Sequence, residues 1–333
     1  MASAAFDVLA IGNAIVDVIA RTDEDFLIRH KMRKGAMQLI DEAQAAKIYD
    51  AMGPAVEVSG GSAANTVVGV AGLGLRAAFI GRVKDDELGR VFAHDIRAAG
   101  VSFTTPPSSA GPSTGRCYVL VTPDGERTLN TYLGAAQDLH PNDVDADAIA
   151  AAQFIYLEGY LWDPKPAKEA FLKAAHIAHA AGRKVALTLS DAFCVDRYRA
   201  EFLDLIRRGT VDLVFANEHE LHSLYQTADF DTALNALRND ARLAVVTRSE
   251  KGCLVVTREE TAAVPASPVE RVVDATGAGD LFAAGFLVGL SRGADYRDAA
   301  RLGALVAAQV IQHLGARPET SLKALAQDNG FDF

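Results

Sequence analysis

The chain has 333 residues, of which 50% are hydrophobic and 23% are charged, and its formal net charge is −10. This length and composition allow a large buried core and argue against a disordered chain. The acidic balance, without any Lys/Arg-rich run, excludes non-specific nucleic-acid binding, so an anionic ligand must be held by local groups.

The sequence predicts neither secretion nor membrane insertion. The N-terminus, MASAAFDVLAIG, lacks the basic and long apolar regions of a signal peptide. The longest apolar run, residues 278–290, is interrupted by an aspartate and is shorter than the roughly 18 residues of a membrane span. Cys117, Cys194 and Cys253 lie far apart, which predicts unpaired buried thiols in a reducing compartment. We therefore expect a cytoplasmic protein with no membrane or nucleic-acid partner.

Apolar strand-like runs alternate with helix-like runs along most of the chain. The expected strands are residues 6–12, 77–83, 153–159, 184–189, 211–217 and 243–248. The expected helices are residues 62–74, 86–100, 165–181, 197–208 and 217–225. This alternation predicts an α/β fold with a doubly wound, mainly parallel sheet and helices on both of its faces.

Two segments, residues 14–58 and 101–132, interrupt this alternation. The first contains three short strand-like runs and one polar helix-like run, and the second contains two alternating runs joined by a Pro-Asp-Gly turn. Such a turn between alternating runs is typical of a β-hairpin. We expect both segments to form a small antiparallel β-sheet, inserted into a single domain of residues 1–333 and able to act as a lid.

The first candidate ligand residues follow the first strand. Asn13 and Asp17 lie just beyond its carboxyl end, where open α/β sheets bind ligands. A carboxylate in an apolar stretch suits bidentate recognition of a vicinal diol. An exposed edge residue is the alternative interpretation.

A glycine pair enters the helix expected at residues 62–74, in the stretch VSGGSAANTVVG. Gly60 and Gly61 let the backbone approach a small ligand, and Ser62 begins the helix. Asn65, one turn later, can donate to and accept from hydroxyl groups. A plain helix cap explains the same pattern.

Two further motifs occupy the second half of the chain. Asn217 and Glu220 lie three residues apart at a helix start, where they could hold waters around phosphate-bound Mg²⁺ or only cap the helix. Thr247 ends a strand and Gly252 follows in a turn. This second pattern indicates either a phosphate contact or a β-hairpin.

The most informative stretch is DATGAGDLFAAGFL, which begins at residue 274. It follows a strand candidate at residues 269–273 and leads into an apolar helix. Free N–H groups of Gly277, Ala278 and Gly279, with the helix dipole behind them, would bind an anion. Tight glycine packing at a helix N-terminus is the structural alternative.

Asp280, in the first turn of that helix, would repel such an anion. Its presence makes sense if the carboxylate is a base that accepts a proton from an attacking hydroxyl. The N–H groups would then stabilise charge on the transferred phosphoryl group.

Other signals are rejected. The chain has no G-x-x-x-x-G-K-[ST] phosphate loop. The glycines of residues 69–74 end a helix instead of joining a strand to one, which excludes a dinucleotide fingerprint. Histidine pairs within residues 176–179 and 219–222 have no evident third ligand for a metal.

The motifs together resemble a known family. GGSAAN near the start and DATGAGDLFAAGF near the end are similar to the two signatures of the ribokinase-like (PfkB-type) kinases. NEHE and VVTRSEKG lie between them, and the resemblance covers about residues 6–318. The long segment from GNAIVDV to MQLID, together with LTLSDAF, looks more like the adenosine kinase branch.

This resemblance implies a ribokinase-like fold, the cosubstrate ATP with Mg²⁺, and a role for each matching residue. Asp280 is the catalytic base, the backbone of Gly277 to Gly279 is the anion hole, and Arg127 is a lid arginine that reaches the phosphates. The implied substrate ligands are Asn13, Asp17, Gly60, Gly61, Ser62 and Asn65. The implied ATP and Mg²⁺ ligands are Asn217, Glu220, Thr247 and Gly252. Asp274 and Thr276 match positions that hold a monovalent cation such as K⁺.

The resemblance favours phosphorylation of a primary hydroxyl of a ribonucleoside, with adenosine as the first candidate. Thr188 stands where eukaryotic adenosine kinases commonly have a substrate-facing Asn, which leaves base preference open. A kinase for a free sugar, such as ribose, fructose or a keto-deoxy sugar acid, is the alternative, and a non-catalytic nucleoside sensor is a remote one. A monomer is favoured over a lid-mediated homodimer.

Overall fold

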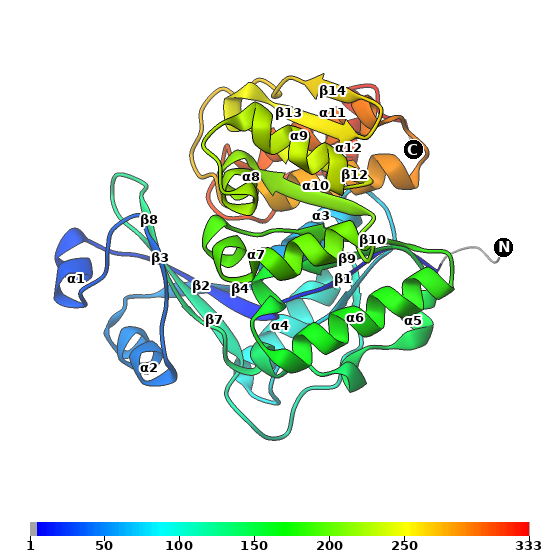
Figure 1. The fold of residues 1–333 in the computed structure, drawn as a ribbon. Coiled ribbons are helices and arrows are strands. Elements are labelled where there is room, and N and C mark those ends of the chain that lie inside the picture. Colours follow the sequence, from blue (N-terminus) through cyan, green and yellow to red (C-terminus); the bar gives the residue numbers. More distant parts are fainter. Residues whose placement is uncertain (1–4, 333) are drawn as a thin grey trace.

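The computed structural model describes residues 5–332 as two β-sheets with helices around the larger one (Figure 1). The large sheet has nine strands in the order β14-β13-β12-β11-β10-β9-β1-β5-β6. Every pairing from β12 to β6 is parallel, and β13 and β14 extend the sheet with antiparallel pairings. The strands are β1 (Phe6–Ile11), β5 (Ala77–Ile80), β6 (Val101–Phe103), β9 (Ala152–Glu158), β10 (Lys184–Thr188), β11 (Leu213–Asn217), β12 (Leu243–Thr247), β13 (Cys253–Thr257) and β14 (Thr261–Val264).

Helices cover both faces of this sheet, which confirms the predicted doubly wound architecture. One face packs against α3 (Ser62–Gly72), α4 (Glu87–Ala98), α10 (Ala278–Ser291), α11 (Tyr296–Val310) and α12 (Leu322–Asp328). The other face packs against α5 (Ala146–Ala150), α6 (Lys165–Ala180), α7 (Ala192–Arg207), α8 (Glu218–Tyr225) and α9 (Phe230–Asp240). Because both faces are buried, the central strands are continuously apolar instead of alternating.

Helix α10 is held closely on two sides. A Cβ on Gly69 of α3 would lie 2.7 Å from Leu281 Cδ1, and a Cβ on Gly285 would lie 2.7 Å from the Cα of Gly303 in α11. Only glycine allows helix axes to approach so closely at these points. The N-terminus of α10 is therefore fixed by its neighbours.

The small sheet projects from one side of the large sheet, on the left of Figure 1. Its strand order is β3-β8-β7-β2-β4. The strands are β2 (Ile15–Arg21), β3 (Met37–Leu39), β4 (Ala55–Gly60), β7 (Gly115–Val121) and β8 (Arg127–Tyr132), with α1 (Glu24–Arg29) and α2 (Glu42–Ala51) in the connections.

The small sheet is mixed, so the prediction of an antiparallel sheet was wrong. The pairs β2–β4 and β7–β8 are antiparallel, but β2–β7 and β3–β8 are parallel. Parallel pairing arises because β2 and β7 come from separate segments that both run outward from the large sheet.

Three predicted boundaries also need correction. Residues 101–103 form β6 in the large sheet, so they do not belong to the second inserted segment. Residues 269–273 form no strand, since the N–H groups of Val273 and Asp274 bond to the carbonyl of Ile311 at the end of α11. Helix α7 begins at Ala192 and not at residue 197, because the Asp191 side chain caps it by accepting from Cys194 N.

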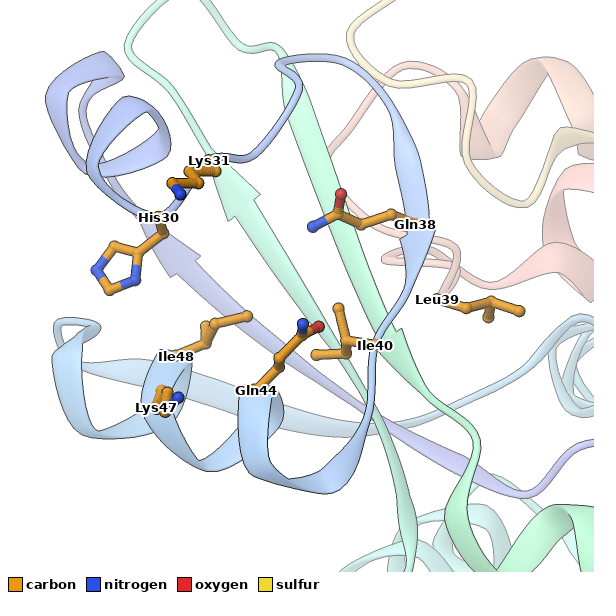
Figure 2. A pocket seen from close by; sticks show the side chains of 8 residues that line it. All are labelled: His30, Lys31, Gln38, Leu39, Ile40, Gln44, Lys47 and Ile48. Carbon is orange, nitrogen blue, oxygen red and sulfur yellow. The ribbon is translucent and has the colours of Figure 1, made fainter.

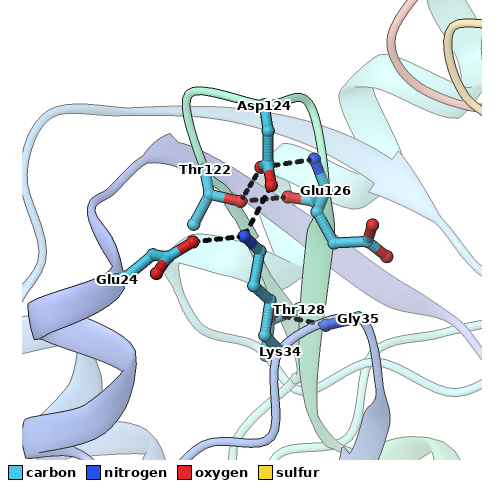
Figure 3. Close-up of polar contacts among 7 residues, drawn as sticks. All are labelled: Glu24, Lys34, Gly35, Thr122, Asp124, Glu126 and Thr128. Carbon is cyan, nitrogen blue, oxygen red and sulfur yellow. Dashed lines mark hydrogen bonds and ion pairs between the residues drawn. The ribbon is translucent and has the colours of Figure 1, made fainter.

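The predicted hairpin between β7 and β8 is confirmed, and a charged network supports its turn (Figure 3). Asp124 accepts a hydrogen bond from Thr122 Oγ1 at 2.6 Å, and Gly125 has a φ of 85° that favours glycine. Lys34 pairs with both Asp124 and Glu24, which connects the turn to α1. Lys34 holds the pKa of the Asp124 carboxyl well below its usual range.

The three cysteines are free and buried, as predicted. Within residues 5–332, no helix is long and apolar enough to cross a membrane. Part of the N-terminal stretch for which we predict no signal peptide, residues 1–4, lies outside the described residues.

Candidate active site

A cavity of about 890 Å³ lies where the carboxyl ends of the large-sheet strands face the small sheet. Its volume is within the range of small-molecule sites. The predicted site residues that line it are Asn13, Asp17, Gly61, Ser62, Asn65, Asn217, Glu220, Thr247, Thr276, Gly277, Gly279 and Asp280. The predicted residues outside its lining are Gly60, Arg127, Gly252, Asp274 and Ala278. The fold thus gathers most of the predicted residues into one space.

Asp280 lies in the first turn of α10, and both of its carboxylate oxygens accept hydrogen bonds from the start of α3. Ser62 Oγ donates to Oδ1 at 2.6 Å, and Asn65 Nδ2 donates to Oδ2 at 2.9 Å. Burial raises the pKa of Asp280, and these two donors and Arg317 oppose the rise. A carboxylate of raised pKa that faces a cavity has the properties of a general base.

The turn before α10 presents backbone donors to the same cavity. Gly277 has a φ of 80°, and a Cβ there would lie 2.6 Å from Ala316 Cβ, so glycine is required. Within residues 5–332, no hydrogen-bond partner satisfies the N–H of Gly277 or Gly279, whereas Ala278 N–H donates to Ala275 O at 3.2 Å. Two of the three predicted N–H groups are thus open to an anion, and that of Ala278 is not.

Asp17 faces the cavity from β2 of the small sheet. A Cβ on Gly60 would lie 2.4 Å from Asp17 Cγ, so the first glycine of the pair makes room for this carboxylate. Burial and the charge of Asp280 raise the pKa of Asp17 to about 6, against the lowering effect of Arg317 and Arg127. No hydrogen bond from the described part of the chain reaches the Asp17 carboxylate. Its oxygens are available as acceptors.

Glu158, at the end of β9, is a site residue that the sequence reasoning missed. Its carboxylate accepts from Asn13 Nδ2 at 2.6 Å, Asn13 N at 3.2 Å and Ala63 N at 2.8 Å. The side chain is buried, and burial raises its pKa to about 7. A single carboxylate at the end of the apolar run QFIYLEG was the available signal.

Asn217 and Glu220 form a reciprocal capping box at the start of α8. Asn217 Oδ1 accepts from Glu220 N at 2.9 Å, and Glu220 Oε2 accepts from Asn217 N at 3.0 Å. Both side chains also line the cavity, so the capping and ligand interpretations are compatible. Burial raises the pKa of Glu220 to about 7.

Thr247 lines the cavity, whereas Gly252 lies outside it. Thr247 ends β12 and lines the cavity. Gly252 lies in the hairpin between β12 and β13, where a Cβ would lie 2.1 Å from the carbonyl oxygen of Val264. For Gly252 the structure supports the hairpin interpretation.

Arg127 lies on β8 and is buried against the turn that precedes α10. Its Nη2 lies 2.8 Å from Asp274 Oδ2, and its Nη1 donates to Thr276 Oγ1 at 3.4 Å. Within the described chain, Nε has no hydrogen-bond partner. In this structure Arg127 is thus paired with a carboxylate beside the turn and does not reach into the cavity.

An apolar region lies at the small-sheet end of the cavity. It is formed by Ile15, Met37, Leu39, Leu129, Leu133 and Phe193. Met37, Leu39 and Phe193 are exposed, with 45%, 50% and 63% of their surface accessible. Short strands and an aromatic residue at a helix start gave too little sequence signal to predict this surface. A flat apolar group would cover it.

Comparison with known proteins identifies the family of the chain. Residues 6–323 match the pfkB family of carbohydrate kinases. The chain belongs to this family. It is therefore a phosphotransferase.

Two solved structures resemble the kinase over almost its whole length. The adenosine kinase from Sinorhizobium meliloti is 55% identical, with 98% of this chain and 99% of that chain covered and a TM-score of 0.92. A probable sugar kinase protein from Rhizobium etli CFN 42 is 54% identical, with 99% and 100% covered and a TM-score of 0.93. These scores confirm the predicted ribokinase-like fold.

Curated relatives include both nucleoside and sugar kinases. The adenosine kinase of Saccharomyces cerevisiae is 28% identical over 332 residues, which cover 92% of this chain and 95% of the relative. Fructokinase-1 of Oryza sativa is 32% identical over 238 residues, which cover 70% and 73%. Kinases of this family use ATP with Mg²⁺.

The residues of the kinase fit the two expected ions differently. In the described chain, no group of three or more His, Cys, Asp or Glu side chains could hold a metal ion directly. Glu220 lines the cavity with both oxygens bonded to Asn217, so it fits contact with the water shell of a phosphate-bound Mg²⁺ and not direct coordination. Asp274 fits a monovalent cation poorly, because Oδ1 accepts from Thr276 N and Oγ1, and Oδ2 accepts from Gly315 N and pairs with Arg127.

The small sheet carries a second cavity of about 420 Å³ (Figure 2). It lies between the end of α1, β3 and α2, and it shares Gln38 and Leu39 with the large cavity. Residues of the short strand β3 therefore line both spaces.

Proposed function

We propose that this kinase transfers the γ-phosphoryl group of ATP to the 5′-hydroxyl of adenosine. The observation that carries the proposal is the position of Asp280. Its carboxylate accepts hydrogen bonds from Ser62 and Asn65, and it follows directly on the turn that carries the open N–H groups of Gly277 and Gly279. A base in that place can accept a proton on one side while backbone donors stabilise phosphoryl charge on the other.

The phosphoryl acceptor would bind to cavity oxygens that receive no hydrogen bond from the protein. Asn13 Oδ1 and Asn65 Oδ1 are buried without a hydrogen-bond partner in the described chain. No hydrogen bond from the described chain reaches the Asp17 carboxylate, which burial and nearby charges alone influence. Buried acceptors of this kind favour a ligand that brings several hydroxyl groups. A ribose supplies them, with its vicinal diol on Asp17.

In the proposed step, the 5′-hydroxyl displaces Ser62 Oγ from Asp280 and gives its proton to the carboxylate. The hydroxyl oxygen forms a bond to the γ-phosphorus, the bond from that phosphorus to the bridging oxygen breaks, and ADP leaves with the electron pair. The N–H groups of Gly277 and Gly279 stabilise the charge of the transferred group. Asn217 and Glu220 would hold the waters of Mg²⁺, which neutralises phosphate charge when bound.

A nucleoside is favoured over a free sugar because the cavity has an apolar region beyond the acceptor residues. Met37, Leu39 and Phe193 would cover a nucleobase, for which a free sugar has no counterpart. The similarity to the Sinorhizobium meliloti adenosine kinase supports the same choice. The fructokinase relatives keep a sugar kinase as the second candidate.

We further propose that the small sheet is a lid. It supplies Asp17 and the apolar region, and Arg127 connects it to the turn before α10. When it closes, Arg127 would exchange Asp274 for the phosphates of ATP, which keeps water from the phosphoryl group. A dimerisation sheet is the alternative. We infer a cytoplasmic monomer, in keeping with three free buried thiols.

The test is ADP release measured across adenosine, inosine, guanosine, cytidine, ribose and fructose. We expect the highest kcat/KM with adenosine. A higher value with a free sugar would replace the nucleoside assignment. Binding of adenosine without ADP release would show a sensor.

Asp280→Asn tests the base. Turnover should fall by about 10²- to 10⁴-fold, the contribution of a positioned base, while the affinity for ATP and adenosine changes little. Asp298→Asn, in the first turn of α11 and with a half-exposed side chain, is the matched control. An Asp280→Asn variant that keeps half of the wild-type turnover would contradict the assignment.

A further inference from the structure

Three consecutive residues after α11 each contact a different part of the candidate active site. Gly315 N donates to Asp274 Oδ2 at 2.8 Å. Ala316 packs on Gly277, at a distance that leaves no room for a Cβ there. Arg317 reaches the junction between β4 and α3. The segment therefore lies directly behind the anion-binding turn and joins it to the acceptor side.

Arg317 contacts Ser59 and Ala64, which lie on either side of the glycine pair Gly60 and Gly61. Its Nε donates to Ser59 O at 3.0 Å, its Nη2 donates to Ser59 Oγ at 2.8 Å, and its Nη1 donates to Ala64 O at 3.4 Å. Asp95 of α4 holds Ser59 from the opposite side through Ser59 N at 2.8 Å. A planar guanidinium with several fixed donors suits this task, which a lysine could only partly perform.

The segment that Arg317 holds contains or borders the residues that contact Asp17 and Asp280. Gly60 makes room for the Asp17 carboxylate, and a Cβ on Gly61 would lie 2.2 Å from the carbonyl oxygen of Asn13. Ser62 and Asn65 donate to the two oxygens of Asp280. A shift of Ser59 or Ala64 would therefore move the acceptor site relative to the base.

We propose that Arg317 is a positioning residue for phosphoryl transfer, which fixes the segment from Ser59 to Ala64 and brings a positive charge to the acceptor side of the cavity. This inference rests on the proposed function. It assigns a role in the reaction to a residue outside the two signature motifs.

The electrostatic environment agrees with this geometry. Of the charges that act on Asp17, Arg317 lowers the pKa more than Arg127 does, while burial and Asp280 raise it. Arg317 also lowers the pKa of Asp280. The other titratable groups that face Asp280 are Asp17, Tyr156, Glu158 and Tyr160, and Asp95 faces Arg317. Most of these neighbours are acidic, so loss of Arg317 leaves the two carboxyls with little opposing charge.

The test compares Arg317→Met and Arg317→Lys with Arg301→Met, an exposed arginine of α11 that pairs with Asp298. The kcat, the acceptor KM and the pH profile of kcat/KM are measured for each. Arg317→Met should lose about 10- to 100-fold in kcat/KM, as expected for lost charge-assisted hydrogen bonds. Its acidic limb should move up by about one pH unit or more. Arg317→Lys keeps the positive charge but not the fixed donors, so its pH profile should be closer to that of the wild type than its kcat/KM is.

A second readout needs no activity. The chemical shifts of the Asp17 and Asp280 carboxyl carbons, assigned with the Asp17→Asn and Asp280→Asn variants, are titrated by NMR in the ligand-free chain. Arg317→Met should raise both midpoints, and Arg301→Met should raise neither. Unchanged midpoints and an unshifted pH profile would overturn the proposal and leave Arg317 a structural role. If the wild-type chain phosphorylates no acceptor, the proposed function fails, whereas the titration still decides the electrostatic part.

Discussion

Asp17 and Asp280 face the same cavity, but their neighbours prepare them for different tasks. Both oxygens of Asp280 already accept hydrogen bonds from Ser62 and Asn65, which orient the carboxylate. Asp17 receives no hydrogen bond in the described chain, and Gly60 leaves room for its carboxylate. An oriented carboxylate suits proton transfer, and an unoccupied one suits ligand hydroxyls.

Asp17→Asn should therefore affect binding more than turnover. We expect the acceptor KM to rise by about 10- to 100-fold, because buried hydroxyls lose a charged partner, with little change in the KM for ATP. Asp25→Asn, an exposed aspartate of α1, is the control. Steady-state kinetics with adenosine and 2′-deoxyadenosine measure the effect. If the wild-type enzyme handles both acceptors equally, Asp17 does not bind the diol.

Among the elements, the two that meet at the cavity differ in how they are held. Helix α10 is packed through glycines against α3 and α11, whereas the small sheet extends outward and is joined at its outer end by the exposed pairs of Lys34. These exposed pairs lie within the small sheet, whereas the buried pair of Arg127 with Asp274 joins β8 to the turn before α10. In the closure that we propose, that buried pair would break and the small sheet would move towards α10.

The lid proposal predicts protection of the small sheet when both ligands are present. Hydrogen exchange in β2, β3 and β8 should slow when adenosine and a non-hydrolysable ATP analogue are added together. Arg127→Ala should lower kcat more than it raises the adenosine KM. Arg116→Ala is the matched control, since Arg116 of β7 lies over the Tyr132 ring within the same sheet. Unchanged exchange together with a kinetically silent Arg127→Ala would favour a dimerisation sheet.

The sequence predicted the elements that alternate regularly and the residues in its two glycine motifs. The apolar runs fixed the central strands, and Asp280 lies in the predicted first turn of α10. The small sheet's pairing directions depend on contacts between separate segments, which local patterns do not contain. Arg317 and Glu158 were missed for a similar reason, since each acts through hydrogen bonds to residues far away in the chain.

At the scale of the whole molecule, an acidic chain is expected to bind an anionic cosubstrate. With a net charge of −10, the overall field does not attract ATP. The cavity also contains carboxyls whose pKa burial raises, to about 7 for Glu158 and Glu220 and to about 6 for Asp17. Each of these favours protonation in the folded state and links stability to pH.

Glu158→Gln tests this linkage. Because the folded-state pKa of Glu158 lies above its usual value, its contribution to stability is full below about pH 4.5 and is lost as the pH rises through about 7. Between pH 6 and 8, we expect the free energy of unfolding to decline by about 1 kcal/mol less in the variant than in the wild type. Chemical denaturation at both values measures this, with the exposed Glu259→Gln as control. If the free energy of unfolding declines equally in the variant and the wild type, Glu158 is not the group responsible for the pH dependence.

The glycine contacts of α10 have a consequence for how acceptor preference diverges and can be redesigned. Any side chain at Gly69 or Gly285 would separate α10 from a neighbouring helix and displace Asp280, so these positions allow little variation. The residues that would cover a nucleobase, Met37, Leu39 and Phe193, are exposed and take no part in these glycine contacts. A library confined to those three positions could therefore exchange one acceptor for another while leaving the phosphoryl-transfer machinery intact.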